Sequence, residues 1–126
     1  MKLFRILFAL LLIATASAAQ ALEIKPYTPA ALAEAQKADK PYALHFHADW
    51  CPVCRAQSKV LEGMKSDKAL NLTVFVVNYD KEKELRKAFG VRTQSTIIVF
   101  IGKVEAARLA GESAEAKIRA ALSAAL

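Results

Sequence analysis

Two cysteines separated by two residues, Cys51 and Cys54, restrict the fold and chemistry of this chain more than any other feature. They are also its only cysteines. A disulfide between such close neighbours closes a very short loop and restricts the unfolded chain little, so a structural staple explains the pair poorly. Reversible redox chemistry explains it better.

The cysteine pair lies between a predicted strand and a predicted helix. The apolar run 42–47 before the pair is typical of a buried strand. The segment after it has apolar residues at helical spacing, which are Val53, Val60, Leu61 and Met64. A helix N-terminus presents unpaired N–H groups and the positive end of the helix dipole, and both lower the pKa of a cysteine there. We therefore expect Cys51 to be an attacking thiolate at the surface, and the shielded Cys54 to resolve the mixed disulfide.

The residues from Trp50 to Cys54, Trp-Cys-Pro-Val-Cys after a strand, resemble the active site of the thioredoxin superfamily. The resemblance covers about residues 22–126. It implies an α/β thioredoxin-like fold with a central mixed sheet flanked by helices. It also implies thiol-disulfide oxidoreductase activity through a redox-active Cys51–Cys54 disulfide, and we expect neither a cofactor nor a bound metal.

The N-terminal residues have the layout of a secretory signal peptide. Lys2 and Arg5 precede the apolar run 6–14, and residues 15–21 are small or polar and end in Ala-Gln-Ala. We therefore predict a signal peptide at 1–21 and one domain at 22–126, with a second possible cleavage site after Ala18. An uncleaved anchor is the alternative, although the apolar run is short against the ~20 residues that span a bilayer.

Composition agrees with one small globular domain. The chain has 126 residues, of which 55% are hydrophobic. Its 18 basic and 12 acidic residues give a net charge of +6, and loss of Lys2 and Arg5 would leave 16 basic residues and a charge of +4. The basic residues are scattered without interleaved aromatic residues, which argues against nucleic-acid binding.

The rest of the pattern alternates between strands and helices. Strands are expected at 22–25, 42–47, 72–77, 96–101 and 104–109, and helices at 30–38, 51–65, 81–89 and 114–126. Caps and turns are expected at the ends of these elements. Thr28 and Ser113 are expected as N-caps, with Pro29 at a first helical position. Gly90 is expected to end a helix in the left-handed conformation, and residues 102–103 to form a hairpin turn. Alternating elements followed by a hairpin imply a mixed sheet between helices.

The segment 90–96 departs from the family pattern. It resembles the thioredoxin loop that faces the cysteines, pairs with the substrate backbone and screens the sulfurs from metals, where a cis-proline precedes the threonine. Ser95 stands in place of that proline, and a cis bond before a non-proline residue costs about 3 kcal/mol, so we expect a trans bond. We expect Gln94, Ser95 and Thr96 to contact substrate. Gln94 and Ser95 could hydrogen-bond to the substrate or to Cys51, and a tolerated loop substitution is the alternative.

Two histidines precede the cysteines. His45 stands where thioredoxins bury an acid beneath the second cysteine, so we expect it to move the proton of Cys54. A buried histidine satisfied by a backbone carbonyl is the alternative. His47 points to the same face and is expected to pack or to modulate Cys51. Together with the two cysteines, these histidines also allow a tetrahedral zinc or a copper site as a further alternative.

The residues that flank the pair are expected at the surface. Trp50 is expected in an apolar lip where a substrate docks, with packing as the alternative. Pro52 suits the first turn of a helix, where its missing N–H is no loss. Asp49 and Arg55 are expected to be exposed, and Arg55 either favours the Cys51 thiolate or an acidic substrate, or is simply a solvated charge.

The leading hypothesis is a periplasmic oxidoreductase that reduces or exchanges disulfides of exported proteins. By resemblance, a membrane thiol-disulfide carrier would supply its electrons, and the protein would act as a monomer. Pro52 between the cysteines resembles glutaredoxins and oxidases and argues for an intermediate potential, whereas the absence of an inserted helical domain argues for a reductase. The alternative is a non-catalytic module that binds a metal or a partner protein through the Cys/His cluster.

Overall fold

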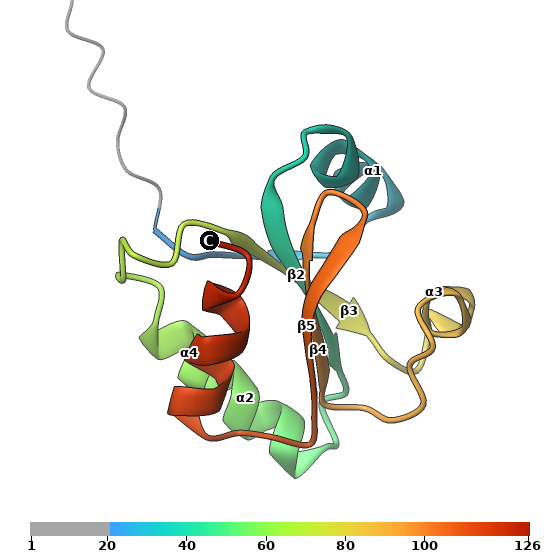
Figure 1. Ribbon diagram of the computed structural model, residues 1–126. Coiled ribbons are helices and arrows are strands. Elements are labelled where there is room, and N and C mark those ends of the chain that lie inside the picture. The colour runs from blue at the N-terminus through green and yellow to red at the C-terminus, as the bar shows by residue number, and fades with distance from the viewer. Residues whose placement is uncertain (1–20) are drawn as a thin grey trace, which may run out of the picture.

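The computed structural model describes residues 21–126, which form five strands and four helices (Figure 1). In chain order the elements are β1 (Glu23–Pro26), α1 (Pro29–Lys37), β2 (Pro41–His47), α2 (Pro52–Gly63), β3 (Thr73–Asn78), α3 (Lys83–Ala88), β4 (Thr96–Ile101), β5 (Val104–Ala110) and α4 (Glu115–Ser123). The predicted signal peptide lies outside the described residues, except for Ala21.

The strands form one mixed sheet in the order β1-β3-β2-β4-β5. The central strand β2 runs parallel to β3 and antiparallel to β4, while β1 is parallel to β3 and β5 is antiparallel to β4. This mixed sheet confirms the predicted fold class. Because β2 is paired on both sides, its C-terminal end, which leads directly to Cys51, is held firmly in place.

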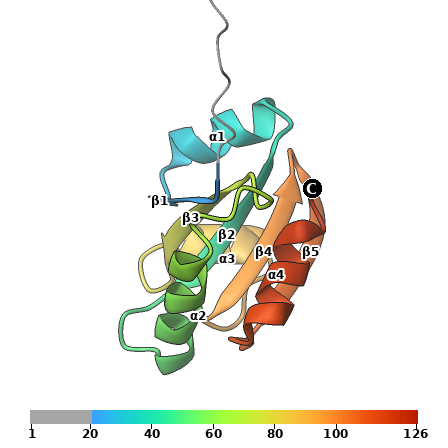
Figure 2. The same ribbon diagram turned by 90° about the vertical axis from the view of Figure 1, so that its left-hand side faces the viewer.

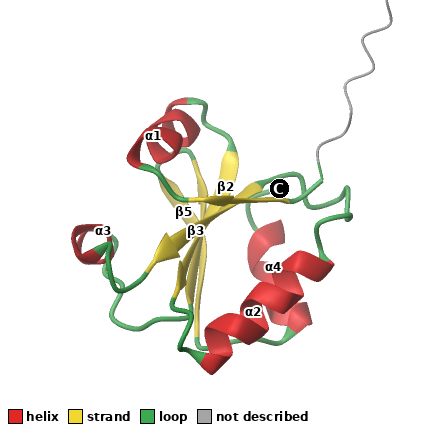
Figure 3. Ribbon diagram, turned by 180° about the vertical axis from the view of Figure 1, so that it is seen from behind, coloured by secondary structure: helices red, strands yellow, loops and turns green. Residues whose placement is uncertain are grey.

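Helices cover both faces of the sheet. In Figure 3, α1 and α3 lie on one side of the strands and α2 and α4 on the other, and Figure 2 shows α2 and α4 side by side. The core beneath α2 and α4 includes Ala43, Leu61, Met64, Val74, Ile97, Val99, Ile118 and Leu122. The core on the opposite face includes Leu32, Leu44, Phe46, Phe75, Val77, Ile98 and Phe100. Successive apolar residues along each central strand thus point alternately into one core or the other.

Most predicted boundaries are confirmed to within one or two residues. The Thr28 hydroxyl accepts a hydrogen bond from the backbone N–H of Ala31 at 3.1 Å, as expected of an N-cap, and Pro29 begins α1. Gly90 has a φ of +64°, the left-handed conformation predicted for it. Helices α2, α3 and α4 are each shorter than predicted. No helix within residues 21–126 is long and apolar enough to cross a bilayer.

The predicted cap of the last helix is wrong. Ala114, not Ser113, is the N-cap residue of α4, and no side chain caps this helix. The first turn closes on the carbonyl of Ala114, which accepts from the backbone N–H of Ile118 at 3.1 Å. Ser113 therefore lies one residue outside the helix, where its hydroxyl has no capping geometry.

Candidate active site

Cys51 is the N-cap residue of α2. Its Sγ accepts a hydrogen bond from the backbone N–H of Cys54 at 3.2 Å, and its carbonyl accepts from Arg55 N–H at 3.1 Å. The sulfur thus occupies the place of a capping oxygen, at the positive end of the helix dipole. This arrangement favours a thiolate over a thiol, as the sequence predicted.

The two thiols have pKa values shifted in opposite directions. Burial alone would raise the pKa of Cys51, but hydrogen bonds from the Cys54 thiol, from the backbone of Cys54 and Val53 and from the Ser95 side chain outweigh it, so the pKa is lowered. Burial raises the pKa of Cys54 to about 11, and the hydrogen bond that its thiol donates to Cys51 adds to this effect. Cys51 is therefore the more acidic thiol of the pair, and Cys54 keeps its proton.

The exposure of the cysteines differs from the expectation. Cys54 is fully buried, as predicted, but Cys51 is also only 2% exposed, whereas the sequence placed it at the surface. Ala48, Val53 and Tyr79 pack with the two sulfurs in a small cluster. Sequence patterns report the helix terminus but not the neighbours that cover it. A reaction partner can therefore approach Cys51 only through the small part of its side chain that remains open to solvent.

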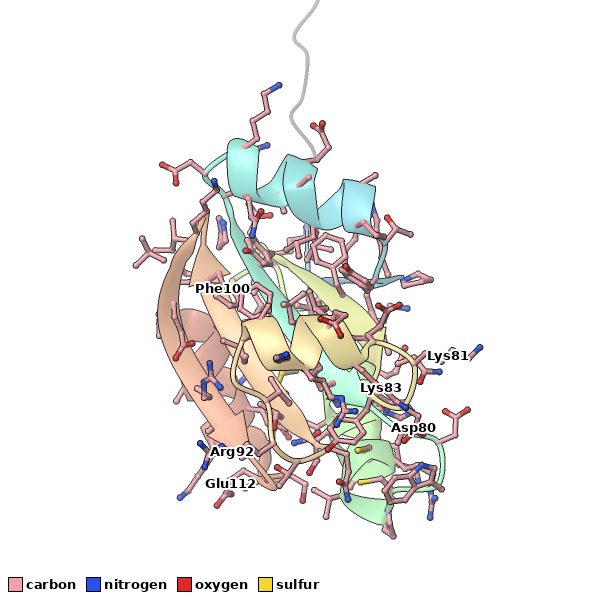
Figure 4. All side chains as sticks on the ribbon, turned by 90° about the vertical axis from the view of Figure 1, so that its right-hand side faces the viewer. Asp80, Lys81, Lys83, Arg92, Phe100 and Glu112 are labelled. Carbon is pink, nitrogen blue, oxygen red and sulfur yellow. The ribbon has the colours of Figure 1, made fainter. Side chains whose placement is uncertain are left out.

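The lip beside Cys51 is exposed, as predicted. Trp50 is 58% exposed, and its Nε1 donates to a carboxylate oxygen of Asp80 at 2.8 Å, which fixes the ring although most of it faces solvent. Pro52 is also exposed. Asp80 lies at the start of the connection to α3, at the same end of the molecule as Arg92 and Glu112 (Figure 4).

Asp49 and Arg55 are both exposed and interact with their neighbours. The Arg55 guanidinium donates to the backbone carbonyl of Asp49 at 2.9 Å, so it supports the turn before Cys51. The Asp49 carboxylate lies 2.9 Å from Nε2 of His47, and the Ser58 hydroxyl lies 3.3 Å from Nδ1 of the same ring. His47 is thus tied to both the turn and α2, which fits the predicted packing role.

His45 is completely buried, on the same face of β2 as His47, with ring centroids 5.4 Å apart. Its Nε2 lies 2.9 Å from Oε1 of Gln57, so its partner is a side-chain carbonyl and not the backbone carbonyl considered above. Its Nδ1 has no hydrogen-bond partner among the described residues. Burial lowers the pKa of His45 to about 4, so the imidazole is neutral near pH 7.

The loop before β4 has the trans geometry predicted for it, because the described residues contain no cis peptide bond. Ser95 has a φ of +59°, a left-handed conformation that costs a non-glycine residue about 1–2 kcal/mol. Its N–H donates to the Phe46 carbonyl at 2.9 Å, and its carbonyl accepts from Gly111 N–H at 3.1 Å. These backbone bonds tie the loop to β2 and to the end of β5.

Side chains of this loop are partly engaged within it. The Ser95 hydroxyl lies at hydrogen-bond distance from the Gln94 carbonyl and also contacts Cys51, so its single proton serves one of the two at a time. The Thr96 hydroxyl donates to the carbonyl of Thr93 at 2.8 Å. Thr96 is almost fully buried, whereas Gln94 is half-buried. Of these three side chains, only that of Ser95, which is itself buried, contacts Cys51.

The sequence analysis missed Gln57, which is fully buried on the face of α2 that carries Cys54 and Leu61. Its Nε2 donates to the carbonyls of Ser95 at 2.9 Å and Glu112 at 2.8 Å. A sequence signal for its burial was present. Gln57 lies three residues after Cys54 and four before Leu61, so it shares the buried face of the helix with both.

The metal alternative lacks a ligand cluster. In the part of the chain that the structure describes, no group of three or more His, Cys, Asp or Glu side chains is arranged to hold a metal ion. The Nε2 atom of His45 is committed to Gln57 and that of His47 to Asp49. The predicted ligands therefore do not converge on one point.

Comparisons with known proteins agree with this geometry. The thioredoxin family model matches residues 24–124. The thioredoxin of Alicyclobacillus acidocaldarius is 32% identical over 96 residues, covering 76% of this chain and 91% of the relative. The thioredoxin of Rhodospirillum rubrum is 32% identical over 74 residues, covering 58% of this chain and 71% of the relative.

Solved structures show the same likeness. The crystal structure of Trxlp from Edwardsiella tarda superposes with a TM-score of 0.76 at 34% identity, covering 80% of this chain and 99% of that one. The match to the family model covers every helix and strand apart from the first residue of β1, and it includes the two cysteines at the start of α2. This chain belongs to the thioredoxin family.

Proposed function

We propose that the protein is a thiol-disulfide oxidoreductase that reduces disulfides of other proteins. The observation that carries the proposal is the placement of Cys51 Sγ at the N-cap of α2, 3.2 Å from the N–H of Cys54, together with the opposite pKa shifts of the two thiols. The family relationship supports the same chemistry. We propose in addition the roles of individual residues, the class of substrate, the direction of electron transfer and the cellular location.

In the proposed cycle the Cys51 thiolate attacks one sulfur of a substrate disulfide. A mixed disulfide forms, and the substrate's other sulfur leaves as a thiolate. Cys54 then loses its proton and attacks Cys51 Sγ, which forms the Cys51–Cys54 disulfide and releases the second substrate thiolate. The substrate gains two electrons and the protein loses two, so a dithiol donor must reduce the protein again.

We assign His45 a role in the proton transfer from Cys54. The imidazole is neutral and its Nδ1 lone pair has no partner among the described residues, so this atom is the available acceptor. Since the pKa of His45 is lowered to about 4, the ring would hold the proton only transiently and pass it on.

A substrate chain would dock on the exposed rim around Cys51. Trp50 and Pro52 offer apolar surface on one side, and the half-buried Gln94 offers a polar side chain on the other. Ser95 and Thr96 are buried, so their proposed part is to shape the loop beneath the substrate. An apolar lip opposite a polar loop suits an extended peptide whose side chains and backbone are both contacted.

We further propose that the protein works in the cell envelope after removal of residues 1–21. A compartment that keeps disulfides oxidised would require a membrane thiol-disulfide carrier as the electron source. Export would be tested by N-terminal sequencing of the protein recovered from a periplasmic extract. A mature chain that begins at residue 19 or 22 supports the proposal, and an intact Met1 in the cytosolic fraction contradicts it.

Insulin reduction by residues 22–126, with dithiothreitol as the electron donor, tests the activity. Wild-type protein should accelerate precipitation of the insulin chains, and Cys51→Ser should abolish the acceleration. Cys54→Ser should instead trap a mixed disulfide that a non-reducing gel detects. An inactive wild type, or an active Cys51→Ser variant, contradicts the proposal. The reduction potential measured against glutathione then decides the direction of transfer.

A further inference from the structure

Gln57 connects four segments around the two cysteines. It projects from α2, is completely buried, and contacts His45 on β2, Ser95 before β4 and Glu112 after β5. The three contacts lie between 2.8 and 2.9 Å, so every one is a full hydrogen bond. The proposed catalytic cycle uses none of these contacts directly.

The contacts fix the orientation of the Gln57 amide. Its nitrogen faces two backbone carbonyls, which can only accept, so both of its protons are used. Its oxygen then faces His45, and because this oxygen can only accept, Nε2 of His45 must carry the proton. Gln57 therefore holds His45 in one tautomer and leaves the Nδ1 lone pair free.

The same amide supports the strained part of the loop. Ser95 has a left-handed backbone, and the loop lacks the conformational lock that a proline ring provides. Two backbone hydrogen bonds and the Gln57 amide are the contacts that hold its peptide groups. An apolar side chain at position 57 would remove the amide contact, and the buried carbonyl of Ser95 and the partly buried carbonyl of Glu112 would each lose one partner.

Resting on the proposed function, we infer that Gln57 is a positioning residue, which holds Ser95 beside the thiols and His45 in its Nε2-protonated form. The Ser95 side chain is one of the contacts that lower the pKa of Cys51. At Cys54 burial and the contact with Cys51 raise the pKa, and the Ser95 backbone opposes this rise in part. Movement of this loop therefore changes the acidity of the nucleophile as well as the substrate rim.

Gln57→Met removes the amide with little change in length, and Leu61→Ala provides the matched control. Leu61 is also buried on α2, but it packs in the apolar core and makes no polar contact with the loop. The pH dependence of Cys51 alkylation by iodoacetamide is measured for each variant. We expect Gln57→Met to raise the midpoint by about half a pH unit or more. Leu61→Ala should lower the melting temperature and leave the midpoint unchanged.

Insulin reduction by the same variants gives a second readout. Gln57→Met should lower kcat/KM by about tenfold, mainly through kcat, because the loop and His45 are misplaced. A Gln57→Met variant with the wild-type alkylation profile and wild-type rate overturns the inference. If wild-type protein does not reduce insulin, the proposed function fails, and the alkylation profile still decides the role of Gln57.

Nitrogen NMR of the wild-type imidazoles needs no variant and so does not depend on whether Gln57→Met folds. The inference requires one histidine with a proton on Nε2 and none on Nδ1 at pH 7, and His45→Gln assigns that signal. A proton on Nδ1 of His45, or a charged imidazolium at pH 7, overturns the inference.

Discussion

Acidification should destabilise this protein through His45. The imidazole is completely buried, and burial lowers its pKa from 6.5 to about 4. Between these two values the unfolded chain binds a proton that the folded chain does not, so stability falls as the pH falls. The full effect is about 3 kcal/mol, since one pH unit corresponds to about 1.4 kcal/mol, and about 2 kcal/mol of it should be lost between pH 7 and pH 5.

The measurement is urea unfolding of the reduced protein, followed by circular dichroism from pH 7 to pH 4.5. His45→Phe should flatten the dependence over this range, whatever its effect on stability at pH 7, where the unpaired oxygen of Gln57 also contributes. His47→Gln is the control and should keep most of the wild-type slope. Asp67 titrates lower, because its hydrogen bond with Arg119 lowers its pKa below the ordinary 3.8. Equal slopes for wild type and His45→Phe would refute the reasoning.

Three further predictions follow from single contacts. When the reduced protein is treated with iodoacetamide, peptide mapping should show that Cys51 is modified well below the pH at which Cys54 reacts, because the pKa values of the two thiols are shifted in opposite directions. Equal labelling of both thiols at pH 6 would contradict the assigned roles. Ser95→Pro should lower the free energy of unfolding by about 3 kcal/mol, because proline cannot adopt a φ of +59° and loses the N–H that donates to Phe46; an unchanged urea midpoint would show that the loop is not held this way. Gly102→Ala should lower the free energy of unfolding, measured by thermal denaturation, by about 1 kcal/mol or more, because Gly102 has a φ of +59° and the added Cβ would lie 2.3 Å from a carboxylate oxygen of Asp39. In the control Gly63→Ala the added Cβ meets no atom within 4 Å, so this variant should be as stable as the wild type or more stable.

The fold could be predicted closely because local and long-range signals agree. The β-branched and aromatic runs at 72–77 and 96–101 favour strands that are covered on both faces. They form β3 and β4, whose observed ends lie within one residue of the predicted ones. Helix ends were less predictable. Ser113 is a good capping residue, but the first turn of α4 closes on the carbonyl of Ala114, one residue later, in a helix whose Ile118 and Leu122 pack into the core.

The site was predictable where it depends on one element and not where several elements meet. The N-cap position of Cys51 follows from a strand, a turn and a helix that are adjacent in sequence. Its low exposure depends in part on Tyr79, which packs beside it and lies 28 residues later in the sequence. The burial of Gln57 could be predicted from its place in the apolar stripe of α2, but its partners could not, because Ser95 and Glu112 are distant in sequence and meet it only in the folded protein.

The polar groups around the sulfurs also bear on the direction of electron transfer. Donors that stabilise the Cys51 thiolate stabilise the reduced protein, which raises the reduction potential and favours an oxidant. Burial of Cys51 opposes these donors, so the thiolate remains a basic and effective nucleophile, because nucleophilicity falls as the pKa falls. Ser95 is the weakest of these donors and Gln57 holds its carbonyl, so displacement of this loop should lower the reduction potential only modestly, whereas loss of the backbone donors of α2 should lower it more.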